Sequence, residues 1–305
     1  MNTQTSVNTQ STATAREHYT TGSVTSADGT TIGYRQYGHG PGLVLVEGGM
    51  QIAHNFAQLA EALADTFTVY VPDRRGRGLS PYDNNKEYGI QEDVEDLDAV
   101  LTKTGTHSVF GLSTGGLTVL KAVLTLSTIH KIAIYEPGLS VNGSTPLGWV
   151  PRFERERMQG KVEAALVTGM LGPQMGPPIM KYIPRPLLVA FTKKLVAQED
   201  QNGAGEYEAM RALLPTLHHE IRILQTMSGT LEQFRTMQHE TLLLNGSKSP
   251  AFQRFSVAAL EKVLPHVRRV ELPGLGHSGA WNYDKQRNPS GRPELVAQEL
   301  RRFFA

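Results

Sequence analysis

Apolar residues in this chain alternate between short runs and longer stretches with helical spacing. The short runs are typical of strands buried on both faces, and they lie at residues 43–46, 68–71, 108–110 and 132–135. Helical spacing of apolar positions covers residues 56–63, 94–101 and 117–126. Strands that alternate with helices predict an α/β fold with a mostly parallel sheet, right-handed crossovers and helices on both faces.

A hairpin precedes this alternation, and a second α/β stretch closes the chain. Two polar, β-rich runs on either side of Asp28-Gly29 predict an antiparallel hairpin that ends near Tyr37. Near the C-terminus the pattern predicts strands at 241–244 and 267–272 and helices at 252–263 and 293–304. We therefore assign residues 17–138 and 236–305 to one core.

Residues 139–235 interrupt the alternation and predict a helical insertion that serves as a cap or lid. Prolines and methionines are frequent there, residues 162–171 and 207–214 have helical spacing, and no strand pattern is convincing. The methionines have two interpretations. They fill an ordinary core, or they form an adaptable apolar lid over a site.

Composition limits the class of protein. The formal net charge is +1, so electrostatics gives no reason to expect nucleic acid or an anionic membrane as partner. The chain has no cysteine, which excludes disulfides and thiolate metal sites and fits a cytoplasmic location. No apolar run reaches the roughly 18 residues of a membrane span. Residues 1–16 are polar and predict a flexible N-terminal arm.

The candidate for chemistry is a G-x-S-x-G pattern centred on Ser113, between a strand-like run and a helix-like run. A serine at a sharp strand-to-helix turn has strained backbone angles, and a side chain at either glycine would clash with neighbouring backbone. The N-terminus of the following helix would face negative charge that develops on a substrate. The pattern therefore predicts a nucleophile, and the alternative is an ordinary turn.

A serine nucleophile needs a base, and His277 is the histidine best placed to supply it. It lies in Pro273-Gly274-Leu275-Gly276-His277, directly after the last predicted strand. The carboxyl ends of parallel strands share one edge of a sheet, so this loop and Ser113 should emerge side by side. The alternative is a loop histidine without a role. His218 and His219 fall in the insertion, where we expect surface or lid positions.

With these residues in order, the chain resembles the α/β-hydrolase superfamily over roughly residues 17–305. A third motif supports the resemblance, because one stretch is similar to the D-x-R-G-x-G-x-S turn that follows the fourth strand in many members. It reads Asp73-Arg74-Arg75-Gly76-Arg77-Gly78-Leu79-Ser80. The three motifs together are specific for the fold and do not specify a substrate.

The resemblance implies a catalytic acid, and this chain departs from the commonest position for it. Most members place the acid after the seventh strand, where this chain reads Gly246-Ser247-Lys248-Ser249-Pro250 and has no carboxylate. Some members place it after the sixth strand, where Glu136 stands here. The resemblance therefore implies Glu136 as the acid. The alternatives are that Glu136 is a surface residue and that Glu47 or an acid of the insertion takes the role.

The resemblance also implies an oxyanion hole made of backbone N–H groups. The loop after the third strand usually begins His-Gly, and here it reads Glu47-Gly48-Gly49-Met50. A backbone donor needs no side chain, so Gly49 remains the first candidate and Met50 the second, with Thr114 supplying the other N–H. Glu47 would repel an oxyanion, so we expect it to turn away and pair with Arg74, Arg75 or buried backbone.

We therefore expect a serine esterase or lactonase with a Ser113–His277–Glu136 triad, acting on a medium-sized hydrophobic molecule. The resemblance implies no cofactor and no metal, and a homodimer is left open. The alternatives are a non-hydrolytic enzyme of this fold, such as a lyase or a C–C bond-cleaving enzyme, and a ligand-binding module. Halide-displacing and epoxide-opening relatives use an aspartate as nucleophile, so Ser113 argues against both.

Overall fold

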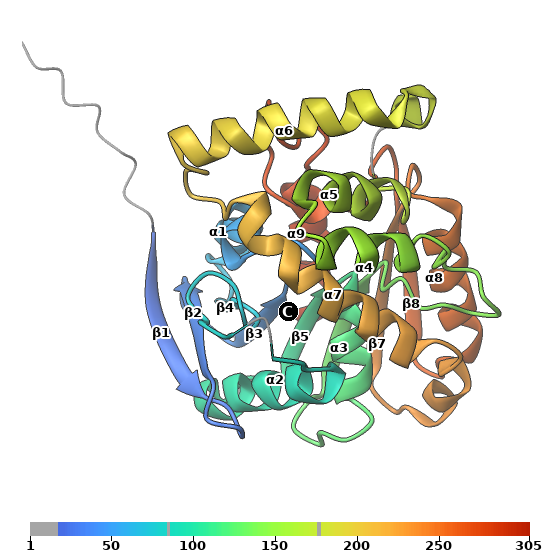
Figure 1. Cartoon of the computed structure of the whole chain (residues 1–305). Coiled ribbons are helices and arrows are strands. Elements are labelled where there is room, and N and C mark those ends of the chain that lie inside the picture. The colour runs from blue at the N-terminus through green and yellow to red at the C-terminus, as the bar shows by residue number, and fades with distance from the viewer. Residues whose placement is uncertain (1–17, 84–85, 176–177) are drawn as a thin grey trace, which may run out of the picture.

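The computed structural model describes residues 18–83, 86–175 and 178–305 (Figure 1). The arm predicted for residues 1–16 lies outside these ranges. In the part of the chain that is described, no helix is both long and apolar enough to cross a membrane.

Eight strands of the described chain form one sheet in the order β1-β2-β4-β3-β5-β6-β7-β8. The first two pair antiparallel as the predicted hairpin, β2 pairs antiparallel with β4, and the remaining neighbours are parallel. Figure 1 shows β1 at one margin and β8 at the other. The strands are β1 (Tyr19–Thr25), β2 (Thr31–Tyr37), β3 (Gly42–Val46), β4 (Thr68–Pro72), β5 (Ser108–Leu112), β6 (Lys131–Tyr135), β7 (Glu240–Gly246) and β8 (Val267–Leu272).

Helices cover both faces of the sheet because successive strand side chains point to opposite faces. In β3, Leu43 and Leu45 join one buried cluster with α1 (Ala57–Leu63) and α9 (Pro293–Phe304). Val44 and Val46 join the other cluster, with α2 (Ile90–Thr104), α3 (Thr114–Ala122) and α8 (Ala251–Val263). The apolar runs of the sequence are therefore strands buried on both sides, and the predicted fold class is confirmed.

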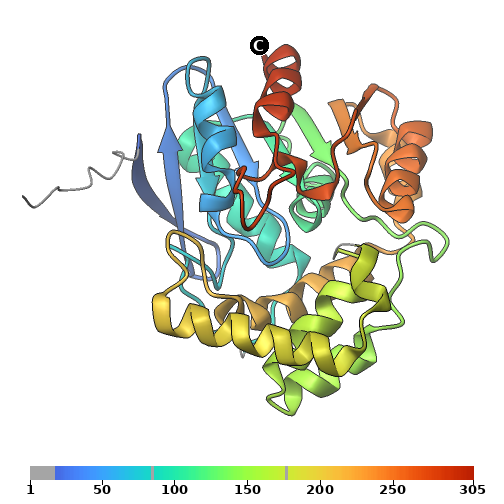
Figure 2. The ribbon, with the colours of Figure 1, turned by 90° about the horizontal axis from the view of Figure 1, so that it is seen from above.

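The segment between β6 and β7 contains four α-helices and two short 3₁₀ helices, and none of its described residues belongs to a strand. Figure 2 shows these helices grouped on one side of the molecule. Helix α5 (Val162–Leu171) has the predicted bounds. The other elements are α4 (Val150–Met158), η2 (Pro178–Tyr182), α6 (Arg185–Asn202), α7 (Met210–Met227) and η3 (Leu231–Thr236).

Helix α6 was not predicted, and its surface explains why. Among its residues only Leu188, Thr192 and Val196 are buried, whereas Leu187 and Phe191 are 61% and 56% exposed. Apolar residues on both the buried and the exposed side give no single apolar stripe, and such a stripe is what makes a helix recognisable in a sequence.

Candidate active site

Ser113 stands between the last residue of β5 and the first residue of α3, at φ 55° and ψ −122°. Its amide donates to the carbonyl of Tyr135 at 3.0 Å, which fixes the turn against the next strand. A Cβ atom on Gly115 would lie 2.3 Å from the Glu47 carbonyl oxygen, and one on Gly111 would lie 2.8 Å from the Gly115 carbonyl oxygen. The motif therefore has glycines where strand and helix backbones meet too closely for any side chain.

Glu136 follows β6 directly, and its side chain is completely buried. Its Oε2 accepts from Nδ1 of His277 at 2.8 Å, and its Oε1 accepts from the Gly246 amide at 2.7 Å. The Glu136 amide donates to the Leu244 carbonyl at 3.1 Å. Two neighbouring strand ends thus hold this carboxylate against the imidazole, which is the arrangement that keeps a catalytic histidine in one tautomer.

His277 begins the 3₁₀ helix η4 (His277–Ala280) after β8 and is 7% exposed. The Tyr135 hydroxyl donates to the Gly276 carbonyl at 2.7 Å and so ties this loop to β6. At the other ring nitrogen, Nε2, the side-chain amide nitrogen of Gln253 lies 3.5 Å away. This contact fits a neutral ring with its proton on Nδ1, because Nε2 then accepts from the Gln253 amide.

Ser113 Oγ and His277 Nε2 share a sheet edge, but the described residues show no hydrogen bond between them in this conformation. In enzymes without bound substrate, catalytic hydrogen bonds are often long and tighten only in the substrate complex. Gln253 lies on α8, within no motif, and sequence reasoning therefore missed it. A pattern search could not find it, because its relation to His277 arises only from the folded contact.

The loop after β3 packs on Ser113. A Cβ atom on Gly48 would lie 3.0 Å from the Ser113 Cβ, and the Gly48 amide already donates to Oε1 of Gln51 at 2.8 Å. Within the described chain, the Gly49 and Met50 amides donate to no protein acceptor. Met50 also has a positive φ of 57°.

Thr114, as the first residue of α3, has an amide without a partner inside the helix. In the described chain, the candidate amides therefore belong to the loop that contacts Ser113 through Gly48 and to the residue that directly follows Ser113.

Positive φ values gather at this site. Of the five non-glycine residues with positive φ in the described chain, three are Met50, Ser113 and Glu136. Such conformations are costly for residues with a side chain and persist where the surrounding structure enforces them, commonly at functional sites. The strained residues therefore mark the same place as the three sequence motifs.

Glu47 is completely buried and accepts the backbone N–H of Arg74 at 2.8 Å through its Oε1. Burial raises the pKa of this carboxyl to about 7, although Arg77 and Arg74 act in the opposite direction. The expectation that Glu47 pairs with Arg74 or with backbone therefore agrees with this contact, which is to the backbone of Arg74. Glu47 makes no contact with His277 among the described interactions, whereas Glu136 does.

The two histidines of the insertion lie on α7. His218 Nδ1 lies 2.8 Å from Oε1 of Glu154 on α4, so it joins two helices of the insertion. His219 is 1% exposed and its ring stacks on Tyr88, with ring centroids 4.0 Å apart. Of the surface or lid positions that we expected, the surface position is wrong for His219, which is buried on a helix of the insertion.

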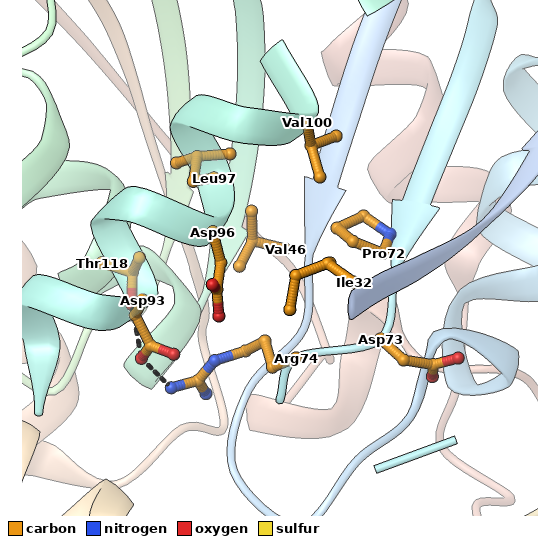
Figure 3. A pocket seen from close by; sticks show the side chains of 10 residues that line it. All are labelled: Ile32, Val46, Pro72, Asp73, Arg74, Asp93, Asp96, Leu97, Val100 and Thr118. Carbon is orange, nitrogen blue, oxygen red and sulfur yellow. Dashed lines mark hydrogen bonds and ion pairs between the residues drawn. The ribbon is translucent and has the colours of Figure 1, made fainter. Parts of the chain in front are cut away.

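A small cavity of about 20 Å³ lies beneath α2 (Figure 3). That volume holds about one water molecule and is too small for an ester substrate. Its lining includes neither Ser113, Glu136 nor His277, so it is separate from the candidate active site. It is lined by Ile32, Val46, Pro72, Asp73, Arg74, Asp93, Asp96, Leu97, Val100 and Thr118.

Comparison with known proteins identifies the family. Residues 39–298 match the family model described as alpha/beta hydrolase family, so the chain belongs to this family. A solved alpha/beta hydrolase from Sphaerobacter thermophilus is 29% identical, with a TM-score of 0.72, over 93% of this chain and 100% of that one. The 3-hydroxybutyrate-oligomer hydrolase of Cupriavidus necator is 24% identical over 250 residues, which cover 77% of this chain and 82% of the relative.

A thermophilic esterase from Thermogutta terrifontis shares the fold at a TM-score of 0.68. It is 17% identical, over 93% of this chain and 98% of that one. The relatives therefore include hydrolases and an esterase with the same fold, and the family inferred from the three motifs is confirmed.

Proposed function

We propose that this protein is a serine hydrolase that cleaves a carboxylic ester or lactone of a medium-sized hydrophobic molecule. The observation that carries the proposal is the 2.8 Å bond between His277 Nδ1 and Glu136 Oε2, at the same sheet edge as the strained Ser113. A buried carboxylate on the far nitrogen of a histidine is the arrangement that makes its near nitrogen a base for serine. Ser113, His277 and Glu136 form the proposed triad.

In the first half of the reaction, Ser113 Oγ attacks the carbonyl carbon while His277 Nε2 removes the hydroxyl proton. Nε2 gives up its contact with Gln253 when it turns to Ser113. Glu136 accepts from Nδ1–H throughout and stabilises the imidazolium that forms. The histidine then returns its proton to the leaving alkoxide, and an alcohol and an acyl group on Ser113 result.

In the second half, water attacks the acyl group with His277 again as base; the bond to Ser113 Oγ then breaks, Oγ takes the proton back from His277, and the acid is released. In both halves negative charge develops on the carbonyl oxygen. The Gly49 and Thr114 amides are the proposed donors to this oxygen, with Met50 as the alternative to Gly49. Preorganised donors of this kind lower the barrier because they need no rearrangement as the charge appears.

The helical segment 139–235 is the proposed cap, and it supports a hydrophobic substrate. Its apolar cluster is built on Phe153, Leu166 and Leu214, and Met50 of the loop after β3 packs against that cluster. The cluster therefore reaches the loop that carries the proposed oxyanion donors. Hydrolysis, rather than lyase chemistry, is supported by the Cupriavidus relative, which is named as a hydrolase of 3-hydroxybutyrate oligomers.

A product assay tests this function. The purified protein should be incubated with p-nitrophenyl esters of increasing acyl length and with lactones of increasing ring size, followed by mass spectrometry of the products. We expect the free acid and alcohol, or the hydroxy acid from a lactone, and no decarboxylated or C–C-cleaved product. Absence of turnover on all of these substrates, or products of a lyase reaction, would contradict the proposal.

A further inference from the structure

The turn after β4 carries two buried arginines whose acidic partner comes from the inserted segment. Arg74 and Arg77 are 5% and 1% exposed. Both guanidinium groups bind Oε1 of Glu220 on α7, which is itself 1% exposed; the bond from Arg74 Nη1 measures 2.8 Å. Arg74 also binds Asp93 on α2, and Figure 3 shows this pair from close by. A carboxylate of the insertion is thus enclosed by core cations.

The same arginines contact the loop that would bind the oxyanion. Arg77 Nη1 donates to the carbonyl of Gly48 at 3.0 Å and to that of Gln51 at 3.2 Å. These two carbonyls bracket the Gly49 and Met50 amides. One guanidinium therefore fixes both ends of this short loop while its other nitrogen binds Glu220.

Thr114, which carries the other proposed oxyanion donor, also contacts one of these arginines. Arg74 Nη1 donates to Oγ1 of Thr114 at 3.2 Å, and Thr114 directly follows the proposed nucleophile. Glu220 also lies against Gly49 itself, because a Cβ atom on Gly49 would be 3.4 Å from Glu220 Cγ. The two proposed oxyanion donors, one on the β3 loop and one on α3, are thus connected through Glu220 and its arginines.

Glu220 connects the two arginines through its negative charge. Burial acts to raise the pKa of its carboxyl, but Arg74 and Arg77, with the Thr114 hydroxyl, lower it to about 2. Glu220 is therefore anionic at neutral pH. Removing its charge would take away the ion-pair partner of Arg77 beside Arg74, which keeps Asp93, in an interior where unpaired charge is strongly unfavourable.

We propose that Glu220 is a positioning residue for the reaction, which couples the docking of α7 to the placement of the Gly49 and Thr114 amides through Arg77 and Arg74. This inference rests on the proposed function. A displacement of oxyanion donors by a fraction of an ångström to 1 Å is enough to reduce turnover severely without removing any group that touches substrate.

The test is Glu220→Gln, which keeps the shape of the side chain and removes its charge. We expect kcat for a p-nitrophenyl ester to fall by about 10- to 100-fold, while KM changes by less than about threefold. Affinity for a phenylboronic acid, which forms a tetrahedral adduct on a serine, should fall with kcat. Amide hydrogen exchange in peptides covering residues 47–52 should accelerate.

A second variant covers the case in which Glu220→Gln does not fold. Arg77→Lys keeps a cation beside Glu220 but replaces the planar fork by a single nitrogen, which cannot take the places of both Nη1 at the loop carbonyls and Nη2 at Glu220, so it should show the same loss of kcat. The matched control is Arg222→Gln. Arg222 is on the same helix, two residues further on, and pairs with Glu87 of the core at an exposed position that does not contact the loop.

The possible outcomes distinguish failure of the positioning role of Glu220 from failure of the proposed hydrolase function. Folded Glu220→Gln and Arg77→Lys variants with wild-type kcat and unchanged exchange at residues 47–52 would overturn the positioning role alone. An equal loss in Arg222→Gln would also overturn it, because any disturbance of α7 would then suffice. A wild-type protein that hydrolyses no ester would overturn the proposed function and this inference with it.

Discussion

Two buried glutamates near the proposed site have different partners. Glu136 leaves the end of a central strand, and its two oxygens bind the imidazole of His277 and the amide of Gly246. Glu220 comes from a helix of the inserted segment and binds two arginines. The first carboxylate acts on the proposed base directly, whereas the second acts only through side chains that hold the loop. This difference predicts a graded series of losses.

The largest effect is expected at Ser113, the proposed nucleophile. Ser113→Ala should lower ester turnover by roughly 10³-fold or more, because no acyl-enzyme can form. The measurement is kcat/KM with circular dichroism as a check of the fold. Ser256→Ala is the control, since Ser256 is a fully buried serine on α8 with no interaction with the triad in the described chain. Retention of more than about a tenth of the activity by Ser113→Ala would remove Ser113 from the mechanism.

Glu136→Gln should come next, with a loss of about 10²- to 10⁴-fold in kcat, because the imidazole would lose its anionic partner. Glu240→Gln is the control, because this exposed carboxylate stands at the opposite end of the neighbouring strand. If kcat fell no more than is expected for Glu220→Gln, there would be no evidence that Glu136 acts on His277 more directly than Glu220 acts on the loop. A crystal structure with another carboxylate on His277 Nδ1 would move the acid elsewhere.

The sequence singles out Glu136, which contacts His277 in the structure, and does not single out Glu220, for a physical reason. Ser113, Glu136 and His277 each follow a recognisable strand, and parallel strands deliver their ends to one edge of the sheet. A local pattern therefore placed all three. Glu220 stands inside a helix, and its arginine partners lie 146 and 143 positions earlier in the chain. Nothing next to it in sequence distinguishes it from a solvent-exposed glutamate.

The secondary structure shows the same contrast between elements that local sequence patterns predict and elements that they do not. The bounds of β8, α9 and α5 were predicted to the residue, and most other core elements to within a few residues. Helix α7 was predicted only in its first residues, because the predicted stretch 207–214 stops directly before Pro215, which lies inside the helix and is usually a helix breaker. The sequence therefore predicts the strand ends that carry chemistry and does not predict buried polar contacts between distant segments.

A smaller effect concerns stability and a third buried carboxyl, Glu47. Burial raises its pKa from the ordinary 4.5 to about 7, so the folded state binds this proton more tightly than the unfolded state. The free energy of unfolding should therefore fall as pH rises from about 4.5 to about 7. Glu47→Gln removes this dependence and should gain up to about 3 kcal/mol relative to wild type across that window.

Urea unfolding of both proteins at pH 5 and pH 8 measures this change. If the free energy of unfolding changed equally with pH in wild type and in Glu47→Gln, Glu47 would ionise as an exposed carboxyl does. Glu220, whose pKa is lowered to about 2, has the opposite sign, because its contribution to stability is lost as pH falls from about 4.5 toward 2.

The smallest expected effect concerns substrate choice. If the inserted segment shapes the pocket, kcat/KM should rise by up to roughly fourfold per added acyl methylene until the pocket is full. Met210→Phe adds bulk beside the apolar cluster of the segment and should move this optimum to shorter chains while changing kcat for the best ester little. Met158→Phe is the control because Met158 is 72% exposed. An unchanged chain-length profile in Met210→Phe would confine the pocket to the core loops.

The most direct test of the account is covalent labelling of the intact protein by a fluorophosphonate, followed by peptide mapping. The account predicts one adduct per chain, located on Ser113, with no adduct on Ser113→Ala and a much slower reaction in Glu136→Gln. Labelling at another residue, or equal labelling of wild type and Ser113→Ala, would contradict the claim that Ser113 is the nucleophile of a serine hydrolase.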